Sequence, residues 1–242
     1  MSEDMSRISA APSLSDAVWN MEMHSHTHWS KDCVVAFEKI IRICQKRGLH
    51  KIAITDHNTA DGALALKKLA PELVIVGEEI MTTQGELLGY YLQESIPAGL
   101  TPQETIRELR DQGAIISVSH PFDRLRKGAW EEADLLTIID QVDAIETFNA
   151  RCMFMEDNLK AMAFGKAHQL LGTVGSDAHT AVEYGKAYAR LPHFEDNPQD
   201  FLRALREAEH VTHLSSWFVH LGSTTAKWTK KLGLHPRAWP GG

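Results

Sequence analysis

The sequence predicts one α/β domain built on a parallel sheet, and three observations support this prediction. Short apolar runs alternate with amphipathic segments, and the connections between them are short, which is typical of parallel α/β folds. The 242 residues are 43% hydrophobic and 24% charged, which is enough apolar material for one large core. At least five apolar runs end at His, Asp or Glu, and a closed α/β barrel carries its active site at such strand ends.

The first half of the chain predicts strands and helices in regular alternation. Strands are expected over residues 19–23, 51–55, 73–76 and 87–92, and helices over 33–47 and 60–69. Gly48 supplies a stop for the first helix. A further helix is expected to begin at Thr101, where Pro102 and Glu104 complete the start signal of a capping box, and to end at Gly113.

The second half continues the alternation. Strands are expected over 114–118 and 142–148, a helix over 154–168, and a last helix from Asn197. A flexible arm is expected over residues 1–18, one domain over 19–221, and a basic tail over 222–242 that contains Lys227, Lys230 and Lys231.

Composition excludes several classes of protein. The formal net charge of −7 argues against a protein that coats nucleic acid. Three cysteines without Cys-x-x-Cys spacing exclude a disulfide framework and a thiolate zinc site, and they suit a reducing cytoplasm. No run approaches a membrane span of about 18 uncharged apolar residues, and the N-terminus lacks a signal pattern, so a cytoplasmic location is expected.

Histidine and acidic residues gather at the ends of the predicted strands. His24 and His26 are two positions apart, so on a strand both imidazoles face one side and can converge on one ion. Asp32 precedes a predicted helix, where its carboxylate can either cap the helix or bind a metal near His26. Asp56 is expected to orient the ring of His57, as metal-bound histidines usually require.

Further candidates follow later strands. Glu79 comes after a four-residue apolar run, Glu86 opens the next strand, and His120 ends the cleanest apolar run. Asp177 and His179 follow glycines that allow close approach of the backbone. Nine candidates exceed the about four to six ligands of one ion and predict a multinuclear site. They are His24, His26, Asp32, His57, Glu79, Glu86, His120, Asp177 and His179.

Several cations are candidates for binding an anionic substrate. Arg151 follows a strand and can either clamp a phosphate or brace a neighbouring loop. Arg124, Arg126 and Lys127 form either a basic rim that faces phosphate or a solvated loop. The nine ligands would bring four carboxylates, which leaves a net charge of about +2 beside three divalent ions. An acidic protein would therefore present a positive pocket.

These motifs, in this order, resemble the PHP (polymerase and histidinol phosphatase) family of metal-dependent phosphoesterases. The segments that carry the resemblance are His24-Ser-His26-Thr, Ser30-Lys-Asp32, Ile54-Thr-Asp-His-Asn58, Gly77-Glu-Glu79, Ser119-His-Pro121 and Gly175-Ser-Asp-Ala-His179. They span residues 22–180, most of the chain. The resemblance implies a distorted (β/α)7 barrel with two or three divalent metal ions at the C-terminal ends of the strands.

The resemblance also implies a distribution of ligands. It implies a first ion bound by His24, His26, Glu79 and Asp177, a second that shares Glu79 and uses His120, and a third bound by Asp32, His57 and His179. Glu22 stands where the family commonly has aspartate, and Glu86 stands where many members have histidine. A carboxylate at position 86 favours a harder ion, so manganese or iron is expected, with zinc as the alternative.

The activity that the resemblance implies is hydrolysis of a phosphate ester by a metal-activated hydroxide. We expect Asp177, His57 and Arg151 to act in catalysis on a small phosphorylated metabolite or a nucleotide. We expect neither a long nucleic acid nor a membrane as partner. Three alternatives stay open: a phosphodiesterase or exonuclease acting on short oligonucleotide ends, an amidohydrolase, which also begins with His-x-His, and an inactive metal-stabilised binding module.

Overall fold

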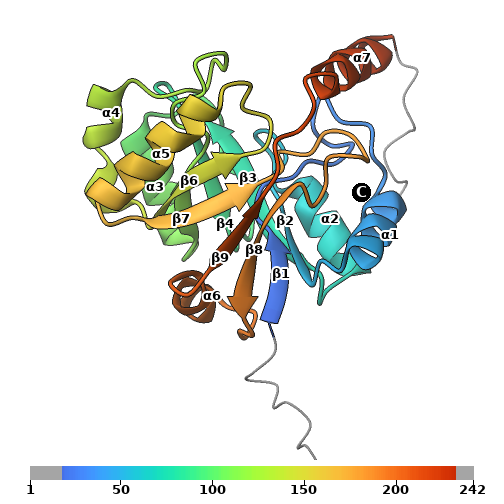
Figure 1. Cartoon of the computed structure of the whole chain (residues 1–242), viewed down its shortest axis with the longest axis horizontal. Helices are drawn as coiled ribbons and strands as arrows, with labels where there is room; N and C mark the ends of the chain where they lie inside the picture. The colour runs from blue at the N-terminus through green and yellow to red at the C-terminus, as the bar shows by residue number, and fades with distance from the viewer. Residues whose placement is uncertain (1–17, 233–242) are drawn as a thin grey trace, which may run out of the picture.

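A nine-stranded mixed sheet organises the molecule, whose computed structural model describes residues 18–232. The strand order is β7-β6-β5-β4-β3-β2-β1-β8-β9, and the sheet curves into a barrel-like arrangement (Figure 1). The strands are β1 (Val18–Glu22), β2 (Lys51–Ile54), β3 (Val74–Met81), β4 (Glu86–Tyr90), β5 (Ile115–Val118), β6 (Ala144–Asn149), β7 (Leu171–Gly175), β8 (Ala187–Pro192) and β9 (Glu209–Thr212). The expected arm lies outside the described residues except for Val18, which begins β1.

The predicted barrel-like α/β fold is confirmed, with parallel pairing in two blocks and antiparallel pairing elsewhere. Strands β1, β2 and β3 pair in parallel, as do β5, β6 and β7. Strand β4 is antiparallel to both of its neighbours, and β8 and β9 add an antiparallel edge beside β1. Only a short turn separates β3 from β4, closed by a hydrogen bond from Thr82 N–H to the Gly85 carbonyl (2.9 Å). A connection of this length permits a hairpin but no parallel crossover.

Helices α1 to α5 lie around the outside of the sheet, and α6 and α7 lie at its two ends (Figure 1). They are α1 (Phe37–Arg47), α2 (Asp61–Leu69), α3 (Pro102–Asp111), α4 (Glu132–Leu136), α5 (Met155–Ala167), α6 (Pro198–Leu205) and α7 (Val219–Lys231). The predicted capping box is present at α3, where Thr101 Oγ1 accepts from Glu104 N–H and the Glu104 carboxylate accepts from Thr101 N–H. Helix α1 begins four residues later than expected, after its N-cap Ala36. Asp32 is therefore not a helix cap, and that interpretation is wrong.

Apolar side chains pack on both faces of the parallel strands. In β2, Ile52 and Ile54 join the cluster beneath the helices, whereas Ala53 joins the barrel interior. In β3, Val74 packs with the first cluster and Ile75 with the second. Because neighbouring side chains of a strand face opposite sides, burial of both faces gives the continuous apolar runs seen in the sequence.

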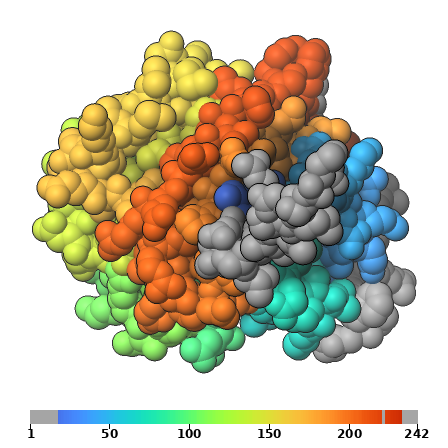
Figure 2. Space-filling view, turned by 60° about the horizontal axis from the view of Figure 1, so that its bottom comes forward, coloured from blue at the N-terminus to red at the C-terminus, as the bar shows by residue number. Residues whose placement is uncertain are grey.

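The C-terminal third of the described chain contributes elements to both ends of the barrel. Strands β8 and β9 and helix α6 lie at the end shown in Figure 2, where they run across the face in orange and red. Helix α7 lies at the opposite end, toward which β1 points (Figure 1). It crosses the expected boundary between residues 221 and 222. Among residues 18–232 no helix combines the length and apolar character needed to span a membrane.

Candidate metal centre

The structure brings all nine candidate ligands together at one end of the barrel. They follow β1 (His24, His26), β2 (His57), β5 (His120) and β7 (Asp177, His179), lie in β3 (Glu79) and at the start of β4 (Glu86), or belong to the loop before α1 (Asp32). Single parallel bridges join Ser25 to Ala178 and His57 to Glu79 beyond the regular strands. The segments that carry the ligands therefore run side by side.

Four fully buried residues form the deepest part, which we call the inner group: His24, His26, Glu79 and Asp177. The Nε2 atom of His26 lies 3.2 Å from Nε2 of His24 and 3.1 Å from Oδ1 of Asp177. Oε1 of Glu79 is 3.3 Å from Nε2 of His24. Strand β3 extends to Met81, five residues beyond the prediction, so Glu79 is held within the sheet.

Three residues closer to solvent form the outer group: Asp32, His57 and Glu86. The Nε2 atom of His57 lies 3.6 Å from Oδ1 of Asp32, and its Nδ1 atom lies 4.0 Å from Oε1 of Glu86. His179 approaches the same Asp32 oxygen at 3.2 Å. Glu79 joins the two groups, because its Oε2 atom is 2.9 Å from Nδ1 of His57.

His120 lies between the two groups. Its Nε2 atom is 3.0 Å from Oε1 of Glu79 and 3.3 Å from Oε2 of Glu86. Gly128 packs directly against Glu86, and a Cβ atom there would lie 2.0 Å from the Glu86 carboxylate. The carbonyl of Gly128 accepts a hydrogen bond from Glu86 N–H (3.0 Å).

The two adjacent glutamates of β3 have different surroundings, because neighbouring residues of a strand face opposite sides. Glu79 faces the imidazoles, while Glu78 accepts a hydrogen bond from the backbone N–H of Ile96 (2.9 Å) on the other side. Burial raises the pKa of the Glu78 carboxyl to about 8. One carboxylate of the pair therefore reaches the mouth of the barrel.

A layer of hydrogen bonds behind the ligands orients their side chains. Oε1 of Glu146 lies 3.0 Å from Nδ1 of His24, and its other oxygen accepts from His120 N–H (2.8 Å). Ser30 Oγ contacts Nδ1 of His26 (3.1 Å). Glu146 was not among the nine candidate ligands, although a carboxylate within a predicted buried strand was a usable signal.

Asp56 does not orient His57, and that expectation is wrong. Its carboxylate accepts hydrogen bonds from the backbone N–H and the hydroxyl of Thr27 and from the hydroxyl of Ser30. The carboxylate of Asp56 therefore fixes the loop after His26, and its backbone carbonyl accepts a hydrogen bond from Glu79 N–H (3.2 Å).

Two backbone features allow the close approach of β7. A Cβ atom on Gly175 would lie 2.2 Å from Cβ of His24, so this position accommodates only glycine without a shift. Asp177 has a φ angle of 50°, in the left-handed region that L-residues rarely adopt. Such conformations persist where the surrounding structure holds them, and they concentrate at functional sites.

The buried surroundings shift the pKa values of His26 and Glu79 and so set their protonation states. Burial and the charges of His179 and His57 hold the pKa of His26 well below its ordinary value, so this ring is neutral at pH 7. Burial alone would raise the pKa of Glu79, but His24 and His57 hold it well below the ordinary value. A neutral imidazole and an ionised carboxylate are the forms that bind metal.

The residues present fit divalent metal ions. Among residues 18–232, Nδ1 of His120 is buried without a hydrogen-bond partner, and the buried Oε2 of Glu79 and Oδ1 of Asp32 face imidazole nitrogens. Donor atoms lie within 4.8 Å of one another in three groups: His26, His57 and His179; His24, His26 and Asp177; and His57, Glu79 and Glu86. Imidazole nitrogen and carboxylate oxygen together are a donor set for divalent transition-metal ions.

Two arginines contact the cluster in different ways. The guanidinium of Arg126, from the loop after β5, forms an ion pair with Asp177 inside the centre. Arg151 is buried behind it, 3.4 Å from Oε1 of Glu183, and its NH2 group donates a hydrogen bond to the hydroxyl of Ser223 in α7. Arg126 thus pairs with the carboxylate of Asp177, while Arg151 donates to the Asp177 carbonyl (3.5 Å) as well as contacting Glu183 and Ser223. The expectation that Arg151 acts in catalysis stays a prediction.

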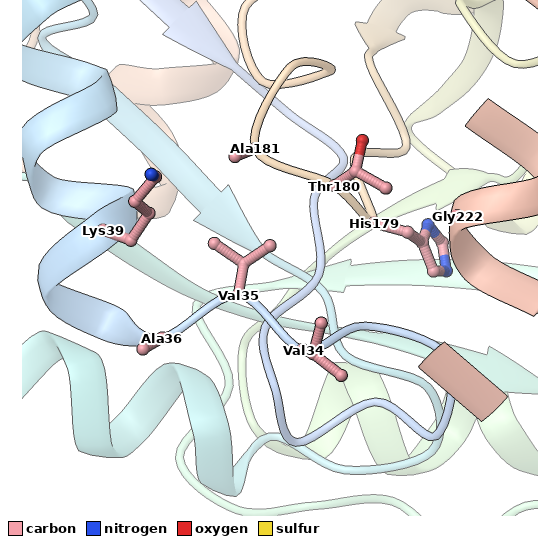
Figure 3. Close-up of a pocket in the computed structure, with 8 residues that line it drawn as sticks. All are labelled: Val34, Val35, Ala36, Lys39, His179, Thr180, Ala181 and Gly222. Atoms are coloured by element: carbon pink, nitrogen blue, oxygen red, sulfur yellow. The ribbon is translucent and has the colours of Figure 1, made fainter. Parts of the chain in front are cut away.

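Two pockets border the outer edge of the centre. One, of about 370 Å³, is lined by Asp32, His57 and Glu86 and by basic residues. The other, of about 360 Å³, lies on the far side of His179, between the segment before α1 and Gly222 of α7, and its walls are mainly apolar (Figure 3). Both volumes are in the range of sites for small molecules.

Comparison with known proteins agrees with this arrangement. Residues 22–145 match the model of the PHP domain, and residues 155–210 match a model described as PHP-associated. Two uncharacterized proteins of Methanocaldococcus jannaschii are similar to this chain. MJ1587 is 37% identical over a match that covers 53% of this chain and 81% of its own length. MJ0417 is 33% identical over a match that covers 77% of this chain and 78% of its own length.

A solved structure shares the fold at low sequence identity. It is a two-domain protein of Bacteroides vulgatus that contains a predicted PHP-like metal-dependent phosphoesterase, with a TM-score of 0.65 and 18% identity. The match covers 81% of this chain, but this chain spans only 65% of that protein. The two family matches, the relatives and the barrel with its imidazole and carboxylate cluster agree, and the chain belongs to the PHP family.

Proposed function

We propose that this protein is a metal-dependent phosphoesterase that hydrolyses a small phosphorylated metabolite or a nucleotide. The observation that supports this most strongly is the convergence of five imidazoles and four carboxylates at the mouth of a PHP-family barrel. The adjoining pocket of about 370 Å³ suits a small molecule better than a long nucleic acid.

Different residues of the chain would bind each of the three ions. The inner group would hold one, Glu79 with His120 and Glu86 a second, and Asp32, His57 and His179 a third. Manganese or iron suits this mixture of oxygen and nitrogen donors, with zinc as the alternative. Divalent ions in such a site polarise a phosphoryl group and lower the pKa of water to about 7.

Other groups would bind and orient the substrate. Arg126 faces the centre and can present its planar guanidinium to two phosphoryl oxygens. His57 lines the pocket and reaches both Glu79 and Asp32. Arg151, which donates to Ser223 and faces Glu183, would act as a positioning residue for the segment that carries Asp177.

Release of inorganic phosphate from a panel of phosphomonoesters and nucleotides tests the proposal. The protein is loaded with manganese and compared with Asp177→Asn and with Asp140→Asn, a change at an exposed aspartate away from the centre. We expect turnover of one substrate class that Asp177→Asn abolishes and Asp140→Asn preserves. No release by folded, metal-loaded protein would overturn the monoesterase proposal, and phosphodiesters would be tested next.

A further inference from the structure

Helix α7 brings a lysine to the mouth of the metal centre. Nζ of Lys227 lies 3.3 Å from Oδ2 of Asp32, a member of the outer group. One turn later, Lys230 donates hydrogen bonds to the carbonyl oxygens of His28 and Ser30, in the loop that carries Asp32. These contacts hold the last turns of α7 against the ligand-bearing loop.

The start of α7 is held as well. The hydroxyl of Ser223 lies 3.0 Å from NH2 of Arg151. Gly222 packs so closely on the segment after β7 that a Cβ atom there would lie 2.7 Å from Cγ2 of Thr180. The helix is therefore placed across the carboxyl ends of the strands (Figure 1), and the position of Lys227 follows from contacts at both ends.

Four cations surround the pocket above the outer group. They are Lys31, Arg126, Lys127 and Lys227, and the same pocket is lined by only two carboxylates, Asp32 and Glu86. Arg126 reaches inward to Asp177. Within residues 18–232, Lys31 and Lys127 form no ion pair, so two of the four cations at the mouth have no carboxylate partner among these residues.

We infer that this cationic mouth binds a second anionic group of the substrate and that Lys227 is its specificity-determining residue. The inference rests on the proposed function, in which the metal cluster and Arg126 receive the phosphate of the scissile ester. Three lysines then remain at the rim of the same pocket. A molecule of this size with two phosphates, or with a phosphate and a carboxylate, satisfies both sets of charges.

The ion pair between Lys227 and Asp32 links the two halves of the site. The Lys227 side chain is 53% exposed, whereas that of Asp32 is 8% exposed and lies beside His57 and His179. When Asp32 serves as a metal ligand, its negative charge is taken up by the ion. Lys227 is then free to pair with an anionic group that enters the pocket.

Three non-hydrolysable probes test this inference: methylphosphonate, 3-phosphonopropionate and propane-1,3-diphosphonate. Each is titrated calorimetrically into manganese-loaded protein and, as a reference, into the same manganese buffer. We expect one or both bifunctional probes to bind about tenfold more tightly than methylphosphonate, as one charge-assisted contact allows. Whether the carboxylate or the second phosphonate gives the gain identifies the second group.

Variants assign the preference to Lys227. Lys227→Ala is expected to lower the affinity of the preferred bifunctional probe about tenfold and to change that of methylphosphonate less than about twofold. Lys227→Arg should restore the preference. Lys231→Ala is the matched control, because Lys231 lies on the same helix with its Nζ atom 5.6 Å from the centre of the Trp228 ring.

The possible failures are distinguishable. Methylphosphonate binding and phosphate release without any preference for bifunctional probes would overturn this inference alone. If Lys227→Ala lowered the affinity of all three probes equally and Lys227→Arg did not restore it, Lys227 would only position the helix. Neither binding nor phosphate release would overturn the proposed function and this inference with it.

Discussion

The inner and outer groups of the metal centre are built from similar side chains but are held differently. His24, His26, Glu79 and Asp177 are 0% exposed, and hydrogen bonds to Glu146 and Ser30 hold the two histidines from behind. Asp32, His57 and Glu86 line an open pocket, where Asp32 contacts a lysine of α7. Burial and hydrogen bonds therefore preorganise the inner candidate ligands, while Asp32 at the rim also contacts the C-terminal helix.

This difference assigns separate roles to the two groups. Buried side chains held by hydrogen bonds lose little conformational freedom when they bind an ion. Residues at the rim can exchange partners between an ion, a lysine and a substrate. We expect changes in the inner group to affect metal content first, and changes in the outer group to affect mainly one ion and substrate preference.

Glu79→Gln should produce the largest effect. Glu79 contacts His24, His57 and His120, so its loss disrupts more than one proposed ion position. We expect at least two ions to be lost and phosphate release to fall by more than about 100-fold, beyond the cost of losing a group behind a ligand. Metal content is measured by mass spectrometry after dialysis. Asp32→Asn, the comparison variant, should lose at most one ion; equal losses would remove the distinction between the groups.

Glu146→Gln should have the next largest effect, although Glu146 itself is not a proposed ligand. Its carboxylate faces Nδ1 of His24, and the loss of such a partner typically weakens metal binding about 10–100-fold. Manganese affinity is measured by calorimetry, with Glu195→Gln at an exposed position as the control. Unchanged affinity would mean that the strand alone orients His24.

Gly175→Ala tests whether the inner group depends on close backbone contact. The new Cβ atom would lie 2.2 Å from Cβ of His24, so the strands must separate. We expect a loss of about 1–3 kcal/mol in the free energy of unfolding, as for other overpacked positions. Urea denaturation measures this loss. Gly113→Ala, where the Cβ atom meets nothing within 4 Å but φ is +72°, should cost only about 1 kcal/mol.

Metal removal should have the smallest effect, because we expect it to leave the reactivity of the buried cysteine thiols unchanged. Burial raises the pKa of both Cys33 and Cys44 to about 12, so the reactive thiolate forms only as pH rises toward that value. Neither thiol should react rapidly with a disulfide reagent at pH 8, with or without a chelator, whereas urea should expose both. Rapid labelling of Cys33, which lies beside the backbone of His26, after chelation would show that ions hold the inner group together.

Much of the barrel was predictable because burial leaves a local pattern. Apolar runs located the parallel strands except β7, the signals at Thr101 located α3, and the family assignment from the ordered motifs is confirmed. The direction of β4 was not recognised, although the few residues between it and β3 imply a hairpin. Asp32 was ambiguous because the same carboxylate can cap a helix or bind a metal, and local sequence does not distinguish them.

The sequence by itself determined which strand ends carry imidazoles and carboxylates, because spacing along a strand dictates which side chains share a face. Only the tertiary structure decided which distant residues contact these imidazoles and carboxylates and the loops that carry them. Glu146 meets His24 across 122 residues of chain, Arg126 meets Asp177 across 51, and Lys230 reaches His28 across 202. Such contacts depend on how helices and loops pack on the finished barrel, and no local periodicity records that packing.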